Sequence, residues 1–214
     1  MVNDQDSDPS KQLWEHYMGK YQNPNPIARY LTDGFFKRIS SVINTLDNST
    51  SILEVGCGPG ESTRRILGML NGQSLEASEF EQDLVDLHLK HDFPVSIRQE
   101  SAYELQRQDN EFDCIMLLEV LEHLDNYEQA LYEIFRVARK SVIISVPNEP
   151  LWRILNFCRG KYWSDWGNTP GHINHWSPTK FAKLISQYGT IVEIHKPLPW
   201  TIIHAKVDRS EFSK

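Results

Sequence analysis

The sequence predicts an α/β fold in which helices cover both faces of an open, mostly parallel sheet. Short apolar runs alternate with amphipathic helical stretches from residue 51 to residue 188, a pattern typical of strands joined by crossover helices. The last two strand-like runs, 190–196 and 201–207, are separated by only four residues. Because a parallel connection needs a longer crossover, these two runs are expected to pair antiparallel.

The predicted strands are apolar runs bounded by turn residues such as Asn71 and Gly72. In chain order they span 51–55, 73–79, 95–99, 112–118, 141–146, 190–196 and 201–207. The predicted helices between them span 61–70, 82–90, 128–139 and 178–188. Within 128–139, apolar side chains recur at i, i+3, i+4 and i+7, at Leu131, Ile134, Phe135 and Ala138. Ser177 and Pro178 read as the N-cap and first residue of the last helix.

We expect a single domain over residues 1–214, because a chain of this length forms one sizeable core. Residues 1–46 are expected to form an N-terminal helical cap, broken by the prolines of NPNP at 23–26. Residues 148–176 form a loop-rich, aromatic insertion after the fifth strand. In such a sheet the loops after the strands hold the ligand, so this insertion lies on the substrate side.

Composition narrows the class of protein. The 22 Lys and Arg residues are scattered, and 29 Asp and Glu residues give a net charge of −7, which disfavours nucleic acid as a partner. No apolar run reaches the roughly 18 residues of a membrane span. Three cysteines without a C-x-x-C pair indicate reduced thiols, and the polar N-terminus lacks a secretory signal pattern. We expect a cytoplasmic protein and leave its oligomeric state open.

The stretch SILEVGCGPGEST (51–63) places glycines at alternate positions after the first strand. Glycine lets a ligand approach the backbone, and a helix begins directly after the loop. The loop could also be only a tight strand-to-helix turn. Glu79 favours a ligand, because an acid about 20 residues beyond such a loop binds ribose hydroxyls in Rossmann-like folds. Glu61 in the first helical turn would repel a pyrophosphate, so a cofactor without phosphates fits better.

At this point the chain resembles the class I S-adenosylmethionine-dependent methyltransferases, specifically the small single-domain members with the pattern E-x-G-C-G-x-G. LEVGCGPG (53–60) carries that motif, and ESAYEL (100–105) and NEFDCIMLLEVLEHL (110–124) match the family's segments around the third and fourth strands. The resemblance implies a Rossmann-like sheet, S-adenosyl-L-methionine as cofactor, and methyl transfer as the activity. It implies the following cofactor-binding residues: Glu54, Gly56, Cys57, Gly58, Gly60, Glu79, Phe80, Ser101, Ala102 and Glu119.

One position departs from the family pattern. Many relatives carry Asp before the alanine that corresponds to Ala102, where it accepts a hydrogen bond from the adenine amino group. Ser101 stands there in this chain. Either its hydroxyl accepts that bond or Glu100 swings in to do so.

LEVLEH (118–123) supplies the catalytic candidate. His123 follows the fourth strand, and its imidazole takes a proton near neutral pH, as a general base must when the acceptor loses a proton. A purely structural imidazole is the alternative. Methyl transfer is an in-line displacement that depends mainly on alignment.

A divalent metal is a rival interpretation of the same segment. Glu119, Glu122 and His123 are potential ligands suited to Mg²⁺ or Mn²⁺, and His172 or His175 could add a nitrogen. The triplet resembles that of small-RNA 2'-O-methyltransferases and of quinone-pathway O-methyltransferases that act on catechol-like substrates. We favour the metal-free version.

The aromatic insertion predicts the acceptor class. It contains four of the six tryptophans, Trp152, Trp163, Trp166 and Trp176, which suggests a flat, apolar pocket. We therefore expect a small or lipid-like acceptor methylated at oxygen. The alternatives are an aromatic lid or docking patch in this segment, and for the whole chain a non-catalytic interaction protein.

Overall fold

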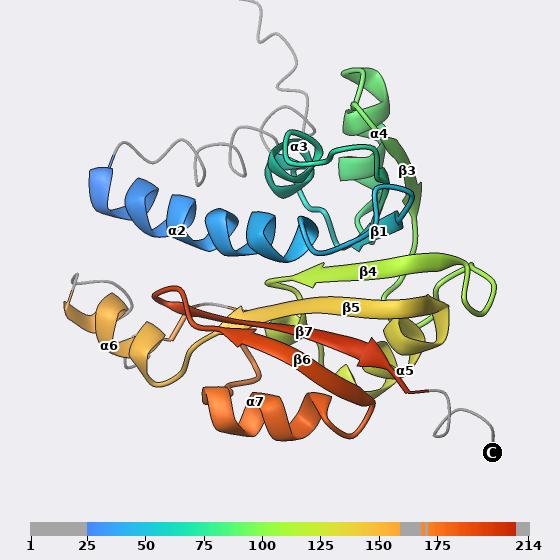
Figure 1. Ribbon diagram of the computed structural model, residues 1–214. Coiled ribbons are helices and arrows are strands. Elements are labelled where there is room, and N and C mark those ends of the chain that lie inside the picture. The colour runs from blue at the N-terminus through green and yellow to red at the C-terminus, as the bar shows by residue number, and fades with distance from the viewer. Residues whose placement is uncertain (1–24, 159–167, 170, 209–214) are drawn as a thin grey trace, which may run out of the picture.

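The computed structural model of the chain describes residues 25–158, 168–169 and 171–208. Its centre is a seven-stranded sheet in the order β3-β2-β1-β4-β5-β7-β6 (Figure 1). Strands β1 to β5 pair in parallel, and β7 lies antiparallel between β5 and β6. The strands are β1 Ser51–Val55, β2 Ser74–Glu79, β3 Ser96–Gln99, β4 Phe112–Leu118, β5 Ala138–Pro147, β6 Gly189–His195 and β7 Trp200–Val207. The predicted open sheet with an antiparallel C-terminal strand is confirmed.

Helices cover both faces of the sheet (Figure 1). They are α2 Pro26–Ile43, α3 Glu61–Leu67, α4 Gln82–Lys90, α5 Tyr127–Val137, α6 Leu151–Cys158 and α7 Pro178–Ile185, with a 3₁₀ turn at η1 Leu121–His123. Asn25 caps α2 through a hydrogen bond from the Ile27 amide, and Ser177 caps α7 as its sequence predicts. Within the described residues, no helix combines the length and apolarity needed to span a bilayer.

The two faces of the sheet have separate cores. Along β1, Ile52 packs with side chains of α2 and α3, whereas Leu53 and Val55 pack with those of α5 and α7. This alternation follows from the two-residue period of a strand, so a nearly continuous apolar run buries both of its faces. Each buried Leu or Ile contributes about 1.5–3 kcal/mol, and these contacts fix the strand ends that carry the site.

Several predicted boundaries shift. The helix predicted over 128–139 ends at Val137, because Ala138 already pairs with Phe112 at the start of β5. Asp113 holds this start through Arg139 Nε at 2.9 Å and Lys140 Nζ at 3.1 Å. The helix predicted over 61–70 ends at Leu67.

The insertion at 148–176 is less irregular than expected, because it begins with the amphipathic helix α6. Residues 1–24 of the expected N-terminal cap lie outside the described residues, as do Trp163 and Trp166. What the structure describes of that cap is α2, which lies across one face of the sheet (Figure 1).

The parallel arrangement decides where the site lies. The carboxyl ends of β1 to β5 meet at one edge of the sheet, so the loops that follow them are neighbours. These loops contain the glycines, Glu79, Ser101, Glu119 and the start of α6. Residues from five separate parts of the chain are thus gathered in one row.

Candidate active site

The loop after β1 contains three glycines with positive φ, 74° at Gly56, 53° at Gly58 and 79° at Gly60. A Cβ on Gly56 would lie 2.7 Å from Val120 Cγ2, and a Cβ on Gly60 would collide with the Phe93 ring. A Cβ on Gly58 would meet no heavy atom within 4 Å. Two of the glycines therefore accommodate the protein's own side chains, and the open space beside the loop lies at Gly58.

Glu79 ends β2 directly beside this loop. Its Oε2 accepts a hydrogen bond from the Gly58 amide at 2.7 Å, and its Oε1 accepts from the amides of Phe80 and Glu81 at 2.8 and 3.0 Å. His88 Nε2 donates to the Gly58 carbonyl at 2.7 Å. Both polar groups of the Gly58 backbone are thus held in place, with a carboxylate at the rim of the open space.

The side chains of Glu54 and Cys57 are buried and support the loop. The Glu54 side chain is buried in β1 and accepts a 2.6 Å hydrogen bond from Thr63 Oγ1 of α3, and burial raises its pKa. Cys57 packs with Ala77 and Val85, and burial raises the pKa of its thiol. The structure gives these two predicted cofactor residues a supporting position, with their side chains directed into the protein.

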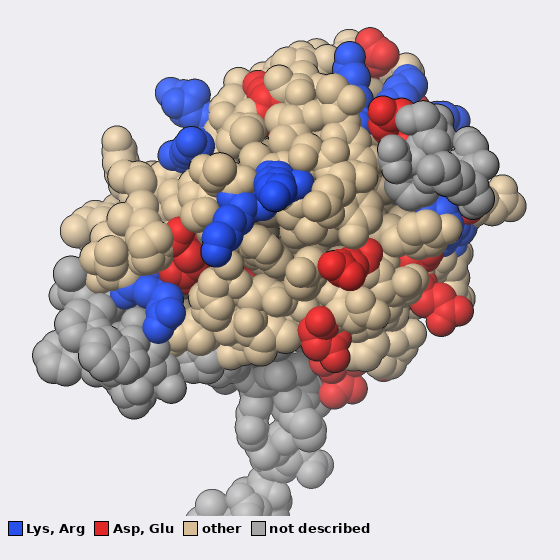
Figure 2. Space-filling view, turned by 90° about the horizontal axis from the view of Figure 1, so that it is seen from below, with Lys and Arg blue, Asp and Glu red and all other residues tan. Residues whose placement is uncertain are grey.

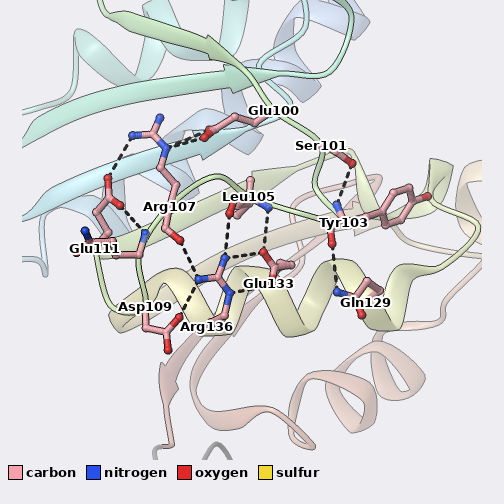
Figure 3. Close-up of polar contacts among 11 residues, drawn as sticks. Glu100, Ser101, Tyr103, Leu105, Arg107, Asp109, Glu111, Gln129, Glu133 and Arg136 are labelled. Carbon is pink, nitrogen blue, oxygen red and sulfur yellow. Dashed lines mark hydrogen bonds and ion pairs between the residues drawn. The ribbon is translucent and has the colours of Figure 1, made fainter.

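The loop after β3 carries Ser101 and Ala102. Ser101 Oγ accepts a hydrogen bond from the Tyr103 amide at 3.2 Å (Figure 3). Glu100 instead points toward Arg107, whose Nε lies 2.8 and 3.2 Å from its two carboxylate oxygens. The expected alternative in which Glu100 swings toward a bound base is therefore disfavoured, because its carboxylate is committed to a buried ion pair. Phe80 directly follows β2, at the same edge of the sheet, and is 60 % exposed.

Glu119 follows β4 in a left-handed conformation with φ of 59°, which is strained for a residue with a side chain. Ser145 of β5 holds it there. The Ser145 hydroxyl accepts from the Glu119 amide at 3.1 Å and donates to Glu119 Oε1 at 2.8 Å. Burial raises the pKa of Glu119 to about 8, and hydrogen bonds with Ser145 and Trp200 offset part of this rise. Ser145 was not among the predicted site residues, although a serine near the end of an apolar strand was a signal.

His123 lies at the end of η1 with its tautomer fixed. Its Nδ1 lies 2.9 Å from the Gly171 carbonyl oxygen, and since a carbonyl only accepts, Nδ1 carries the hydrogen. The lone pair is then on Nε2, which lies 4.0 Å from Glu122 Oε1. Glu122 is 1 % exposed, and its Oε2 has no hydrogen-bond partner within the described residues. Burial, followed by the nearby Glu119, raises the pKa of Glu122 well above its ordinary value.

His172 lies close to both Glu122 and His123. One ligand atom from each of Glu122, His123 and His172 lies within 4.8 Å of the others. The amides of Ile173 and Asn174 both donate to the Glu122 carbonyl, which holds His172 against His123 although 48 residues separate them. Burial lowers the pKa of His172 to about 4, so the ring is neutral.

The structure thus brings together a different set from the predicted metal triplet. Glu119 turns to Ser145, and His172 takes its place beside Glu122 and His123. His175 is exposed and bonds to Asn168 at 2.7 Å, outside this group.

Aromatic rings continue from His172 along the same edge. Trp152 of α6 stacks with His172 at 6.0 Å between ring centroids and contacts Trp200 at 5.9 Å, and Trp200 contacts Phe35 at 5.0 Å. Trp152 Nε1 donates to Thr169 Oγ1 at 2.9 Å. Trp176, in contrast, is buried against Tyr127 and Phe181 and belongs to the core. Of the four tryptophans proposed as pocket walls, the structure places Trp152 beside the site and Trp176 away from it.

Comparison with known proteins identifies relatives of part of the chain. A family model described as a methyltransferase domain matches residues 53–146. A Mycolicibacterium smegmatis protein named a probable S-adenosylmethionine-dependent methyltransferase is 27 % identical over 152 residues, covering 66 % of this chain and 52 % of that protein. The bifunctional methionine biosynthesis protein MetXA/MetW of Rhodopirellula baltica is 25 % identical over 157 residues, covering 61 % of this chain and 23 % of that protein. The chain spans about half the length of these curated relatives, or less.

Solved structures share the fold. Magnesium protoporphyrin IX methyltransferase from Synechocystis PCC 6803, with bound SAH, superposes with a TM-score of 0.67 at 15 % identity, covering 93 % of this chain and 96 % of that one. A SAM-dependent methyltransferase from Aquifex aeolicus gives a TM-score of 0.62 at 13 % identity, covering 81 % and 89 %. These structures show that the chain shares their fold, and the sequence matches show that part of the chain is similar to S-adenosylmethionine-dependent methyltransferases.

The raised pKa of Glu119 predicts how stability depends on pH. The folded protein keeps this proton from the ordinary value of 4.5 up to about 8, whereas the unfolded chain has released it. Folding is therefore favoured most below the unfolded pKa, and this contribution is lost as pH rises through the folded pKa. Substitution by glutamine, which does not titrate, should flatten the decline by up to about 1.4 kcal/mol per pH unit.

Urea unfolding of the wild type and Glu119→Gln between about pH 6.5 and 8 measures this difference, since the protonation of His172 in the unfolded chain contributes to both proteins and cancels in the comparison. Parallel curves for the two proteins would show that Glu119 ionises normally in the folded state.

Proposed function

We propose that this chain is an S-adenosylmethionine-dependent methyltransferase that transfers a methyl group to oxygen of a small or lipid-like acceptor. One observation carries the proposal: a carboxylate-rimmed open space at Gly58 lies in the same row of strand ends as an imidazole with a free lone pair, His123 Nε2. The match of residues 53–146 to a methyltransferase domain supports this interpretation.

The residues present fit the cofactor. Gly58 provides the open space, and Glu79 has acceptor capacity for ribose hydroxyls beyond its three amide contacts. Phe80 offers an exposed apolar side chain for the base, and Ser101 offers a hydroxyl. We assign Gly56, Gly60, Ala102 and Glu119 to the walls of this site, and Glu54 and Cys57 to its support. When bound, the cofactor supplies an electrophilic methyl group on a sulfonium.

The chain's own residues would align the acceptor and accept its proton. His123 Nε2 is available for a proton because Nδ1–H donates to Gly171. The protein then holds the imidazolium beside Glu122, whose carboxyl group lies 4.0 Å away. Alignment provides the rest of the rate, because displacement at a methyl group requires the two reacting atoms in line.

The walls near His123 support an apolar acceptor. Trp152, Trp200 and Phe35 form a row of aromatic rings that extends from His172. Such flat surfaces suit a small aromatic or lipid-like molecule. The charge distribution disfavours a polyanionic acceptor such as nucleic acid, because the net charge of the chain is −7. On the face shown in Figure 2, basic and acidic side chains are interspersed and form no continuous basic surface.

A metal-assisted O-methyltransferase is the second candidate, favoured by the group of Glu122, His123 and His172. Two imidazoles and a carboxylate suit a divalent transition metal. The Nδ1–H bond from His123 to a backbone carbonyl is the orientation that a metal-binding histidine commonly has. A divalent ion held there would lower the pKa of the acceptor hydroxyl, and no protein base would then be required.

Cofactor binding is the first test. Wild type should bind S-adenosylmethionine and S-adenosylhomocysteine with micromolar affinity, in the range usual for enzyme ligands. Glu79→Ala should weaken both by roughly 10- to 100-fold, because it removes charge-assisted hydrogen bonds. Titration calorimetry gives both values.

Glu81→Ala is the matched control for this test. It removes an exposed neighbouring carboxylate that makes no side-chain cap bond to α4. Absence of binding by the wild type would favour a non-catalytic interaction protein with a purely structural glycine loop.

The acceptor class has its own test. Cofactor carrying a labelled methyl group should transfer the label to the metabolite or lipid fraction of a cell extract, and leave protein and RNA unlabelled. The carbon-13 shift of the product methyl group then distinguishes attachment to oxygen from attachment to nitrogen. Label confined to RNA or protein would overturn the assignment, as would an N-methyl product.

Substitution of His123 and chelation separate the two mechanisms. If His123 is the base, His123→Gln should lower turnover roughly 10²–10⁴-fold with little change in cofactor affinity, and a chelator should have no effect. If a metal is bound, a chelator should abolish turnover and an added divalent transition metal such as Mn²⁺ should restore it. His172→Gln should then be as impaired as His123→Gln.

His175→Gln is the control, because His175 lies in the same segment but outside the group of three. It should keep wild-type turnover under both mechanisms. Full activity in His123→Gln would exclude both and leave alignment as the source of the rate.

A further inference from the structure

We propose that the chain docks on the surface of an anionic lipid bilayer with the face beside its acceptor site, and takes a lipid-like acceptor from that surface. The inference rests on the proposed function and specifies where the acceptor comes from. The docking face consists of the N-terminal end of α2 (25–31), the first turns of α6 (151–155), Ile173 next to His172, and the turn between β6 and β7 (196–199).

The segments of the docking face meet around Trp200. The Asn148 amide, just before α6, donates to the Pro199 carbonyl at 2.8 Å, and the Trp152 ring of α6 lies 5.9 Å from the Trp200 ring. Trp200 also contacts Phe35 of α2 at 5.0 Å. In Figure 1 the N-terminal end of α2, α6 and the β6–β7 turn all lie on the left, the side toward which β4 and β5 run. The docking face therefore borders the aromatic row.

Large apolar side chains are exposed on this face. The exposed fractions are 67 % for Ile27, 78 % for Tyr30, 53 % for Ile154, 55 % for Ile173 and 57 % for Leu198. A single exposed apolar residue is ordinary on a protein surface, but here every segment of the docking face presents at least one. Apolar groups gathered in this way mark a surface that contacts another molecule or a membrane.

Basic side chains stand among these apolar groups. Arg29 and Lys196 are exposed, and Arg153 is half-buried directly before Ile154. The segments of the docking face contain no Asp or Glu, although the whole chain has 29 of them and a net charge of −7. The face is thus opposite in charge to the chain as a whole. Basic residues attract anionic headgroups, and apolar side chains beside them enter the interface of the bilayer.

The acids that border the docking face are buried or have a partner. Glu149, which lies just before α6, is buried, and burial raises its pKa. Glu193 Oε2 of β6 lies 2.9 Å from His195 Nε2. Asp33, the first acid of α2, pairs with Arg65 of α3 at 3.1 Å. These carboxyl groups therefore add little repulsion toward an anionic surface.

Docking by this face presents the aromatic row to the bilayer. Trp200 directly follows the β6–β7 turn, and Trp152 lies in α6 two residues before Ile154. The apolar part of a lipid then passes from the bilayer along these rings toward His172, which stacks with Trp152, and its burial in water is avoided. The docking face and the proposed acceptor site thus form one continuous surface.

Vesicle co-sedimentation without cofactor tests the proposal. Vesicles that contain phosphatidylglycerol should bind the wild type, vesicles of phosphatidylcholine alone should not, and added salt should weaken the binding by screening. Lys196→Gln should weaken binding about fivefold, the effect expected of one basic residue near an anionic surface. Leu198→Ser should weaken it roughly five- to tenfold, because the apolar surface that would enter the interface is lost.

Lys206→Gln and Leu89→Ser are the matched controls, because each removes an exposed side chain of the same kind outside the docking face. Both should bind vesicles as the wild type does. Lys196→Gln and Leu198→Ser should keep the melting temperature and the cofactor affinity of the wild type, since exposed side chains contribute little to folding.

No binding to either kind of vesicle would overturn the inference, as would equal binding to both. It would also fail if Lys196→Gln and Leu198→Ser bound like the wild type. A second copy of the chain is the competing occupant, and a wild-type dimer that Leu198→Ser dissociates, measured by light scattering, would overturn the inference in its favour. A protein that binds anionic vesicles but not S-adenosylmethionine would retain the docking face, and the proposed function alone would fail.

Discussion

The contact between the Glu79 carboxylate and the Gly58 amide is the interaction on which the site depends. It joins the loop after β1 to the end of β2, at a point where the backbone is left-handed and only glycine fits easily. Val120 and Phe93 fill the space beside the other two glycines, so the protein's own packing leaves open the one position beside the carboxylate. The geometry of the proposed cofactor site follows from strand order and from side chains that pack around the loop.

On the proposed acceptor side, buried polar groups hold one another in place. Ser145 holds Glu119 in a strained conformation, and the backbone of residues 173 and 174 binds the Glu122 carbonyl. These contacts place two imidazoles and a carboxyl group together in a partly buried setting. Such an arrangement costs stability, because burial disfavours charge on Glu119, Glu122 and His172. Its position next to the aromatic row supports the proposed role at the acceptor.

The sheet, and the position of Glu79 beside the glycine loop, were predictable because each depends on local sequence. Apolar runs define the strands, and Glu79 stands at the end of one of them. The acceptor side depends on long-range order. His172 meets His123 only because segment 171–176 binds η1, and nothing in the spacing of GHINHW predicts that contact. The commitment of Glu100 to Arg107 was missed for the same reason, since it requires a charged side chain to be buried inside the turn.

The central claim is that the cofactor lies at Gly58 with its ribose on Glu79. A crystal structure of the protein with S-adenosylhomocysteine tests it most directly. The account predicts ribose hydroxyls within hydrogen-bond distance of the Glu79 carboxylate, the ligand against Gly58, and the base toward Ser101. A ligand bound elsewhere, with Glu79 contacting only the amides of Gly58, Phe80 and Glu81, would contradict it.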